Sequence, residues 1–370
     1  DAAMATLRAL EPGEDSSQAE RQLRSDLVPR RIELFKQFNN LSQGVKFLVD
    51  MRAEIISMMP ETQELRALND DLRELLTSWF DVGFLNLQRI TWDAPAALLE
   101  KLMAYEAVHE IRSWDDLKNR LDSDRRCFAF FHPSMPDEPL IFVEVALVSG
   151  MADNVQELLD LHALEGDPGK ADTAIFYSIS NAQAGLAQVS FGDFLIKRVV
   201  DELRSELPNL RTFATLSPVP GFRRWLDKLL AETDVAPWTL IQDGVLAEVA
   251  GVGSGSEALQ ILLARDNWHR DEAAVAALRP VLEPLVARYL LKEKMGRRAL
   301  DPVENFHLSN GARLERINWL GDTSRNGLDS AAGLMVNYLY KLSDIEQIHE
   351  DYRGLGKITV AAQVRKVLKR

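Results

Sequence analysis

Two side chains and one loop in this sequence could do chemistry together. The side chains are Ser217 and His307, a hydroxyl and an imidazole. The loop closes an uncharged run and precedes a helical pattern, so its free backbone N–H groups could hold a pyrophosphate. It comprises Ala187, Gln188, Val189, Ser190, Phe191, Gly192 and Asp193. An ordinary strand-to-helix turn with Asp193 as the N-cap fits the same spacing, and the spacing alone favours that alternative.

Ser217 follows an apolar strand pattern at residues 212–216 and stands directly before Pro218. A residue before proline favours extended backbone, and Pro220 and Gly221 then turn the chain into a helical pattern. A hydroxyl held at such a strand end is well placed to meet a reacting group. The alternative is a serine that only hydrogen-bonds its own turn.

His307 lies between Phe306 and Leu308, just before a strand pattern at residues 314–319. The ordinary pKa of histidine suits proton transfer near neutrality. A lone histidine beside apolar neighbours also fits a half-buried structural residue. The other histidines lie in charged helices or turns and are weaker candidates; they are His109, His132, His162, His269 and His349.

The elements that must position these groups fall into two parts. Residues 1–85 show only helical patterns, at 18–27, 30–38, 42–58 and from Pro60 onward, typical of a packing or oligomerisation module. Beyond Phe84, strand patterns at 127–131, 140–148, 173–180, 212–216 and 314–319 alternate with helices. We expect those helices at 194–207, 222–232, 256–265, 271–294 (kinked or broken near Pro280 and Pro284) and 330–342. The pattern predicts an α+β protein with a helical domain at 1–82 and a mixed-sheet domain at 83–370.

The charge, the cysteine count and the absence of certain motifs argue against several classes of function. The net charge of −13 over 370 residues argues against a general nucleic-acid or membrane-surface binder. The single cysteine, Cys127, cannot form an intrachain disulfide or a thiolate metal site, which favours a reducing compartment. We see no secretory signal and no zinc-type histidine pair. The glycine-rich residues 251–256 follow a poor strand pattern, so we interpret them as a linker with Ser256 as the helix cap.

Several blocks together resemble the malonyl-CoA decarboxylase family. They occur in the family's order and spacing and cover nearly the whole second part, which makes them more specific than any single motif. The blocks are residues 127–148, 176–180, 194–200, 216–222, 306–312, 316–319 and 333–338.

This resemblance implies a GNAT (acetyltransferase-type) catalytic domain and conversion of malonyl-CoA to acetyl-CoA and CO2. The acyl-CoA loop would be residues 187–193, the catalytic serine Ser217 and the catalytic histidine His307. Ser178 matches a second serine of the family's site and Tyr340 an aromatic hydroxyl. In the best-aligned family member a glutamate stands where this chain has Ser190, so a carboxylate there is not required or is replaced.

The resemblance also implies an intracellular homo-oligomer, expected to be a tetramer. The chemistry needs no cofactor, because the thioester carbonyl itself can accept the electrons of the broken bond as an enolate. The sequence ends without the peroxisomal Ser-Lys-Leu signal of some relatives, which favours a cytoplasmic bacterial protein. We expect no nucleic-acid or membrane partner.

Two alternatives share the same loop. A GNAT-type N-acyltransferase would use an acyl-CoA and an amine acceptor, and a non-catalytic CoA-binding scaffold would turn over nothing. Incubation with malonyl-CoA alone separates them, since only a decarboxylase releases CO2 without a second substrate.

Overall fold

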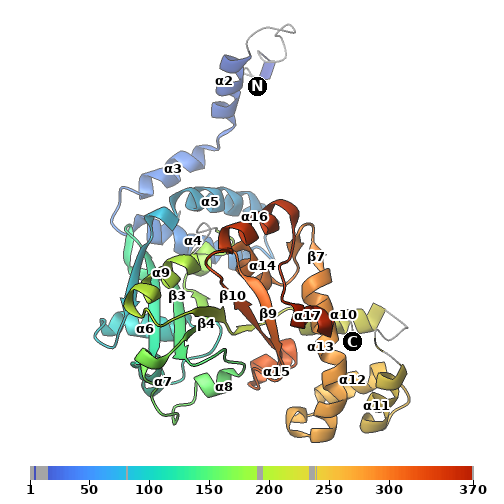
Figure 1. Ribbon diagram of the computed structural model, residues 1–370. Coiled ribbons are helices and arrows are strands. Elements are labelled where there is room, and N and C mark those ends of the chain that lie inside the picture. Colours follow the sequence, from blue (N-terminus) through green and yellow to red (C-terminus); the bar gives the residue numbers. More distant parts are fainter. Residues whose placement is uncertain are drawn as a thin grey trace. The chain divides into compact units, whose positions relative to one another are not determined.

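The computed structural model describes residues 4–5, 16–80, 82–189, 195–232, 238 and 240–368. The chain forms two compact units. The first unit comprises residues 1–86, 131–140 and 181–191, and the second comprises 87–130, 141–180 and 192–370. Figure 1 labels the elements of both. The predicted boundary between residues 82 and 83 stays a prediction.

The first unit is built on helices, as the sequence predicts. They are α2 (Ser17–Leu27), α3 (Arg30–Phe38), α4 (Gly44–Met58) and α5 (Arg66–Trp79), with 3-10 turns at Gln63–Leu65, Val82–Phe84 and Ala184–Leu186. The apolar stripe of α5 packs on α3 and α4, in a core made of Phe35, Leu48, Ile55, Leu72 and Leu75.

A buried arginine fixes the segment that precedes the predicted CoA loop. Arg52 on α4 is 1 % exposed, and its guanidinium donates to the Gly185 carbonyl at 2.6 Å and to Asn69 Oδ1 at 3.1 Å. Gly185 itself lies so close to α4 that a Cβ atom there would stand 1.8 Å from the Val49 carbonyl oxygen. The segment therefore needs glycine at this position, because no side chain fits.

The second unit is built around a mixed sheet of order β1-β2-β3-β4-β5-β10-β6, with β9 paired to β10. The strands are β1 (Asn86–Ile90), β2 (Arg125–His132), β3 (Met135–Val148), β4 (Thr173–Asn181), β5 (Thr212–Thr215), β6 (Ser217–Pro218), β9 (Arg313–Asn318) and β10 (Met335–Leu339). Strands β4 and β5 pair in parallel, and β10 pairs antiparallel with its neighbours. The predicted α+β class, with a mixed sheet after a helical region, is confirmed. The GNAT type of that sheet stays a prediction.

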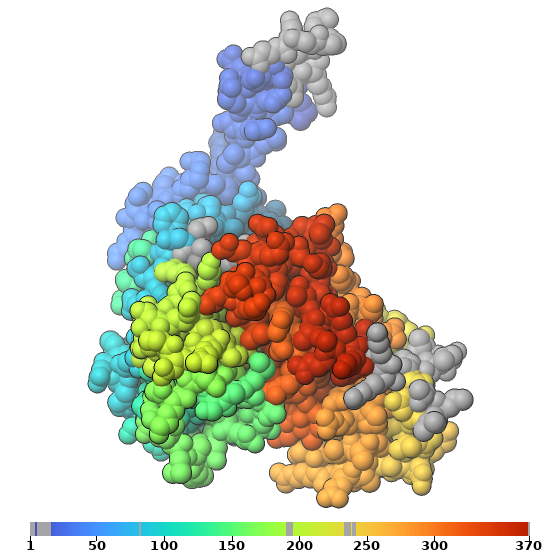
Figure 2. Space-filling view, in the orientation of Figure 1, coloured from blue at the N-terminus to red at the C-terminus, as the bar shows by residue number. Residues whose placement is uncertain are grey.

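Helices cover this sheet and connect its strands. A parallel pair needs a crossover, and α9 (Leu195–Glu206) supplies it between β4 and β5. An ion pair of 2.8 Å joins Lys197 of α9 to Glu346 of α16 (Ile345–Leu355), and Figure 2 shows these helices side by side in yellow-green and red. One part of the core packs Ile175 and Tyr177 of β4 on Val155 and Leu158, the first and last residues of α8 (Val155–Leu158).

The remaining elements of the second unit are short connections and peripheral helices. The helices are α6 (Ala96–Tyr105), α7 (Trp114–Arg120), α8 (Val155–Leu158), α10 (Phe222–Glu232), α11 (Leu240–Ala250), α12 (Gly255–Ala264), α13 (Glu272–Lys292), α14 (Pro302–Ser309), α15 (Arg325–Ala331), α16 (Ile345–Leu355) and α17 (Ala362–Val367). A small hairpin pairs β7 (Lys294–Met295) with β8 (Arg298–Ala299), and 3-10 turns occur at Pro168–Lys170 and Trp268–Arg270.

Two sequence-based expectations about elements are wrong, and a third is wrong in part. The helix predicted at 330–342 is instead the end of α15, a left-handed turn at Ala332 and Gly333, and strand β10. A break in α13 is excluded, because the helix runs without interruption through both prolines, whereas the alternative of a kink there stays a prediction. The glycine-rich segment follows helix α11, and the N-cap of α12 is Ser254, so Ser256 lies inside the helix.

Candidate active site

Ser217 and His307 meet in the second unit. Ser217 is in β6, where its backbone pairs with Val336 of β10, and it is 5 % exposed. Its Oγ donates to Thr215 Oγ1 at 2.8 Å and lies 3.0 Å from Nε2 of His307. Two groups that are 90 residues apart in sequence thus form a hydroxyl–imidazole pair within hydrogen-bond reach.

His307 belongs to helix α14, and two tyrosines contact its ring. The N-terminus of this helix is capped, because the Asp301 carboxylate accepts from the N–H groups of Val303 and Glu304. Pro302 occupies the first helical position, where no N–H donor is needed. Nδ1 of His307 lies 2.8 Å from the Tyr340 hydroxyl. The Tyr338 ring stacks on the imidazole with centroids 4.6 Å apart. Both ring nitrogens of His307 therefore have partners.

One arrangement of protons satisfies all three of these hydrogen bonds. Because Ser217 donates its proton to Thr215, its oxygen accepts from Nε2–H of His307, and Nδ1 then accepts from the Tyr340 hydroxyl. Burial lowers the pKa of His307 from 6.5 to about 3. The ordinary histidine pKa expected from the sequence is therefore wrong, and the ring is neutral at physiological pH. A neutral ring gives up Nε2–H only while it receives a proton at Nδ1.

Asp301 ties the segment after Ser217 to the helix that carries His307. Its Oδ1 caps α14, while its Oδ2 accepts from the backbone N–H of Gly221 at 3.3 Å and from the Tyr289 hydroxyl at 3.2 Å. A Cβ atom on Gly221 would stand 2.2 Å from that hydroxyl, so only glycine fits the turn. One carboxylate thus sets the spacing of the two reactive side chains.

Glu304 lies one turn before His307 and is fully buried. Neither oxygen of its carboxyl group has a hydrogen-bond partner among the described residues, and the same holds for the nearby Tyr338 hydroxyl. Burial, reinforced by the charge of Asp301, raises the pKa of Glu304 well above its ordinary value. Burial therefore favours the protonated, neutral form of the Glu304 carboxyl group.

Ser178 is held by a carboxylate that the sequence did not suggest. Its Oγ donates to Glu106 Oε1 at 2.8 Å and Oε2 at 2.9 Å, and Ser180 donates to the same Oε2 at 3.1 Å. In the described part of the chain, Ser178 makes no hydrogen bond with Ser217, His307 or Tyr340. Phe176, two residues earlier on the same strand, meets the Tyr340 ring edge to face at 6.4 Å. The site role of Ser178 stays a prediction.

The structure describes only part of the predicted CoA loop. Ser190, Phe191, Gly192 and Asp193 lie outside the described residues, and so does any consequence of serine replacing glutamate at 190. Ala187 and Val189 belong to the first unit, and their N–H groups already donate to Ala184 and Leu186 within the turn, at 3.1 Å and 3.0 Å. Gln188 has left-handed backbone with φ of 62°. The phosphate-binding role of the loop stays a prediction.

Three residues of the arrangement were missed by the sequence reasoning. Thr215 stands two residues before Ser217 in an extended segment, so strand periodicity alone places both on one face. Tyr338 has the same relation to Tyr340, but the incorrect helix prediction hid it. Glu106 follows helix α6 in a loop and carries no sequence signal at all.

Two further observations describe the chain as a whole. The described residues contain no group of three or more His, Cys, Asp or Glu side chains arranged to hold a metal ion. Among the described helices, none combines the length and the apolar character needed to cross a membrane.

Comparison with known proteins identifies the family. The model of the malonyl-CoA decarboxylase C-terminal domain matches residues 83–370, and that of the N-terminal domain matches residues 1–80. Mitochondrial malonyl-CoA decarboxylase of Anser anser anser is 42 % identical over 357 residues, or 94 % of this chain and 71 % of the relative. The enzyme of the same name from Rattus norvegicus is 41 % identical over 94 % of this chain and 73 % of its own length.

Solved structures agree with this identification. The crystal structure of malonyl-CoA decarboxylase from Rhodopseudomonas palustris is 45 % identical and has a TM-score of 0.90, covering 99 % of this chain and 85 % of that one. The structure of the same enzyme from Agrobacterium vitis is 42 % identical with a TM-score of 0.88, covering 100 % and 86 %. From its sequence and its fold, the chain belongs to the malonyl-CoA decarboxylase family.

Proposed function

We propose that this protein is a carboxy-lyase that converts malonyl-CoA to acetyl-CoA and CO2 through a thioester enolate, with Ser217 and His307 as its reactive pair and without an added cofactor. Family membership supports the overall reaction. The observation that carries the residue assignment is the 3.0 Å contact between Ser217 Oγ and His307 Nε2, with Tyr340 on the other ring nitrogen.

The reaction sets three physical requirements. The bond between C2 and the carboxylate breaks, CO2 leaves, and the electron pair moves onto the thioester carbonyl as an enolate. Hydrogen-bond donors must stabilise that oxygen, and the carboxylate must be held out of the thioester plane in a poorly solvated pocket. A proton must then reach C2. Each turnover therefore consumes one proton from the solvent.

A neutral His307 suits a relay better than a direct donation from an imidazolium. At pH 7 about one ring in ten thousand would carry a second proton, given a pKa of about 3. In our proposal Ser217 gives its proton to C2, Nε2–H of His307 replaces it, and the Tyr340 proton moves to Nδ1. Solvent then restores the Tyr340 proton. To act in this way, the Ser217 hydroxyl must turn its proton from Thr215 toward the substrate, where it can first donate to the enolate oxygen.

The remaining parts of the proposal concern binding and assembly. Residues 187–193 would bind the CoA diphosphate, and Ser178 and Tyr340 would complete the polar shell of the acyl group. A cytoplasmic homotetramer is part of the same proposal. Helix α2 supports self-association, because it buries no residue and leaves Leu27 65 % exposed at the end of a stripe with Ala19 and Leu23.

Isotope labelling tests the reaction directly. The purified full chain is incubated with malonyl-CoA alone in heavy water, and the products are analysed by mass spectrometry. We expect acetyl-CoA with deuterium in its methyl group, together with CO2. Release of CO2 only when an amine is added would favour an acyltransferase, and CoA binding without any turnover would favour a scaffold.

The residue assignment needs its own experiment. Replacing Ser217→Ala removes both the relay hydroxyl and a donor to the enolate, so we expect kcat to fall by about 10²–10³-fold with a modest change in KM. Ser57→Ala is the matched control, because that hydroxyl only bonds the Glu54 carbonyl within α4. Turnover close to that of the unmodified enzyme in Ser217→Ala would remove Ser217 from the mechanism.

A further inference from the structure

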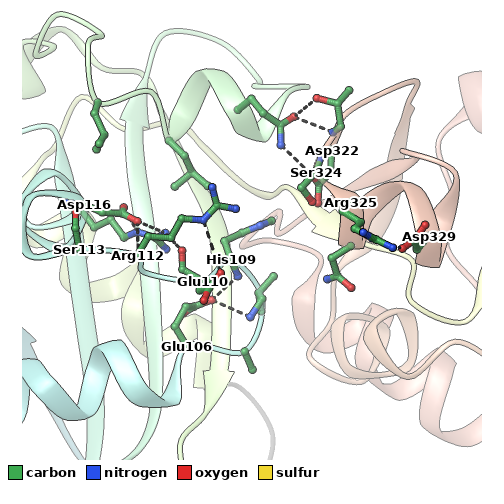
Figure 3. A pocket seen from close by; sticks show the side chains of 18 residues that line it. Glu106, His109, Glu110, Arg112, Ser113, Asp116, Asp322, Ser324, Arg325 and Asp329 are labelled. Carbon is green, nitrogen blue, oxygen red and sulfur yellow. Dashed lines mark hydrogen bonds and ion pairs between the residues drawn. The ribbon is translucent and has the colours of Figure 1, made fainter. Parts of the chain in front are cut away.

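A cavity of about 860 Å³ lies in the second unit and contains neither Ser217 nor His307. One wall is the segment between α6 and α7, which carries Glu106 and His109. The opposite wall is the segment from Asp322 into α15. Gln156 of α8 also lines the cavity and is hydrogen-bonded to Asp322 and Thr323 of that second wall. We call this cavity the His109 pocket, and Figure 3 shows its side chains.

The guanidinium groups around the pocket already have carboxylate partners. Arg120 is 2 % exposed and lies 2.9 Å from Asp116 and 3.0 Å from Glu144. Arg112 and Arg325, which stand at the exposed mouth, pair with Glu110 at 3.7 Å and Asp329 at 3.5 Å. These charges therefore cancel locally and leave little positive charge for a ligand.

Two carboxylates of the pocket have neutral partners only. Glu106 accepts from Ser178 and from the backbone N–H groups of Val108 at 2.8 Å and His109 at 2.7 Å. Asp322 is 4 % exposed, and its Oδ1 accepts from the Gln156 amide at 2.7 Å and the Ser324 N–H at 2.9 Å. Over the described ranges, neither carboxylate forms an ion pair with lysine or arginine. The pocket therefore carries uncompensated negative charge.

His109 adds a hydrogen-bond acceptor to the pocket, close to these two carboxylates. The residue is 8 % exposed, and its Nε2 atom has no partner among the described residues. Its ring bonds the Tyr177 backbone, which leaves Nδ1 as the atom engaged there. Burial lowers the pKa of His109 against the opposing charges of Asp322 and Glu106, so the ring is neutral and Nε2 offers a lone pair. Figure 3 shows the His109 side chain between the two walls.

We propose that the His109 pocket binds a small primary ammonium ligand, whose N–H groups donate to Nε2 of His109 and to the carboxylate of Asp322. A buried polar atom without a partner costs free energy, which a ligand donor recovers. An ammonium group supplies three donors and the positive charge that Glu106 and Asp322 lack. An anion would meet two unpaired carboxylates and be repelled.

The wild-type protein allows a first test by calorimetric titration of the full chain. The probes are n-butylammonium, tetramethylammonium, which has the charge but no N–H, and butyrate, which has the opposite charge. We expect n-butylammonium to bind at least about tenfold more tightly than tetramethylammonium, and butyrate not to bind. Equal binding of the two cations, binding of butyrate instead, or no binding of n-butylammonium would overturn the proposal.

Three variants then locate the site. Asp322→Asn removes the charge with little change of shape, and His109→Phe removes the acceptor but keeps a ring; each should weaken n-butylammonium binding at least about tenfold. Asp329→Asn removes the same charge at the mouth, where Arg325 already neutralises it, and should change binding less than about twofold. An equal loss in Asp329→Asn would show a diffuse surface effect. Binding is the readout, so the result does not depend on the proposed decarboxylation.

Discussion

The buried imidazole of His307 makes a quantitative prediction about stability. The unfolded chain exposes this ring to water, where its pKa is near 6.5, whereas burial lowers the pKa to about 3 in the folded protein. Between these two pH values the unfolded chain binds a proton at His307, whereas the folded protein does not. The contribution of His307 to the free energy of unfolding is therefore fully present above pH 6.5 and is lost as the pH falls toward 3.

The magnitude follows from the linkage relation. Each pH unit inside this window changes the free energy of unfolding by about 1.4 kcal/mol per group, so acidification from pH 7 to pH 5 removes about 2 kcal/mol through His307 alone. Replacing His307→Phe deletes the titrating group and keeps a ring that fills the same space against Tyr338. The variant should therefore lose about 2 kcal/mol less than the wild type over this pH range.

Urea unfolding at pH 7 and pH 5 measures the difference. All other titrating groups are common to both proteins, so their contributions cancel when the two pH-induced changes are subtracted. His162→Phe serves as the control for the histidine-to-phenylalanine replacement itself, because this histidine is exposed in a turn. The same pH dependence in wild type and His307→Phe would show that the ring is accessible to protons, and it would refute the neutral relay.

Three other predictions concern the tyrosines beside His307, the buried Glu304 and the exposed helix α2. Tyr340→Phe leaves Nδ1 of His307 without its donor and should lower kcat by about 10–100-fold. Tyr338→Phe instead removes a hydroxyl that has no partner among the described residues, so it should stabilise the protein by about 1 kcal/mol and leave kcat nearly unchanged. Steady-state kinetics and urea unfolding distinguish the two variants. Glu304→Gln should stabilise the protein more at pH 8 than at pH 5, because a raised pKa in the folded state makes stability fall as pH rises; thermal melts at both values check the sign. Leu27→Glu should reduce the oligomer size measured by light scattering if α2 is an assembly surface, and an unchanged mass would contradict that role.

Most helices and strands of this fold were predicted from the sequence, and strand β10 is the main exception. Residues 30–38 and 222–232 were predicted with the observed bounds, since amphipathic periodicity with a proline or glycine at the start marks such helices. Strand β10 was predicted as helix because it is short and its residues are almost all buried, so apolar and polar side chains do not alternate along it. It also lacks the long continuous apolar run that marked residues 140–148 as a buried strand.

The candidate site shows the same limit. The local sequence around Ser217 and around His307 made each only a weak candidate for a catalytic residue. The resemblance to the family was what identified both as catalytic candidates. The pKa of His307 could not be predicted, because it depends on burial by Tyr338, Tyr340 and other residues distant in sequence. Glu106 was missed for a similar reason, since its partners Ser178 and Ser180 lie more than seventy residues away, at 72 and 74 positions along the chain.

The geometry of the pair depends on contacts that no local segment contains. Asp301 holds the turn after Ser217 through the Gly221 N–H and begins the helix that carries His307, so both reactive groups take their positions from one carboxylate. Asn337 acts in the same way, because its amide donates to the Thr215 carbonyl at 2.7 Å and fixes the end of β5 against β10. Such fixed positions suit the proposed reaction, in which no strong acid takes part. When the proton donor is a neutral relay, the rate enhancement must come from hydrogen-bond donors that are in place before the bond between C2 and the carboxylate breaks.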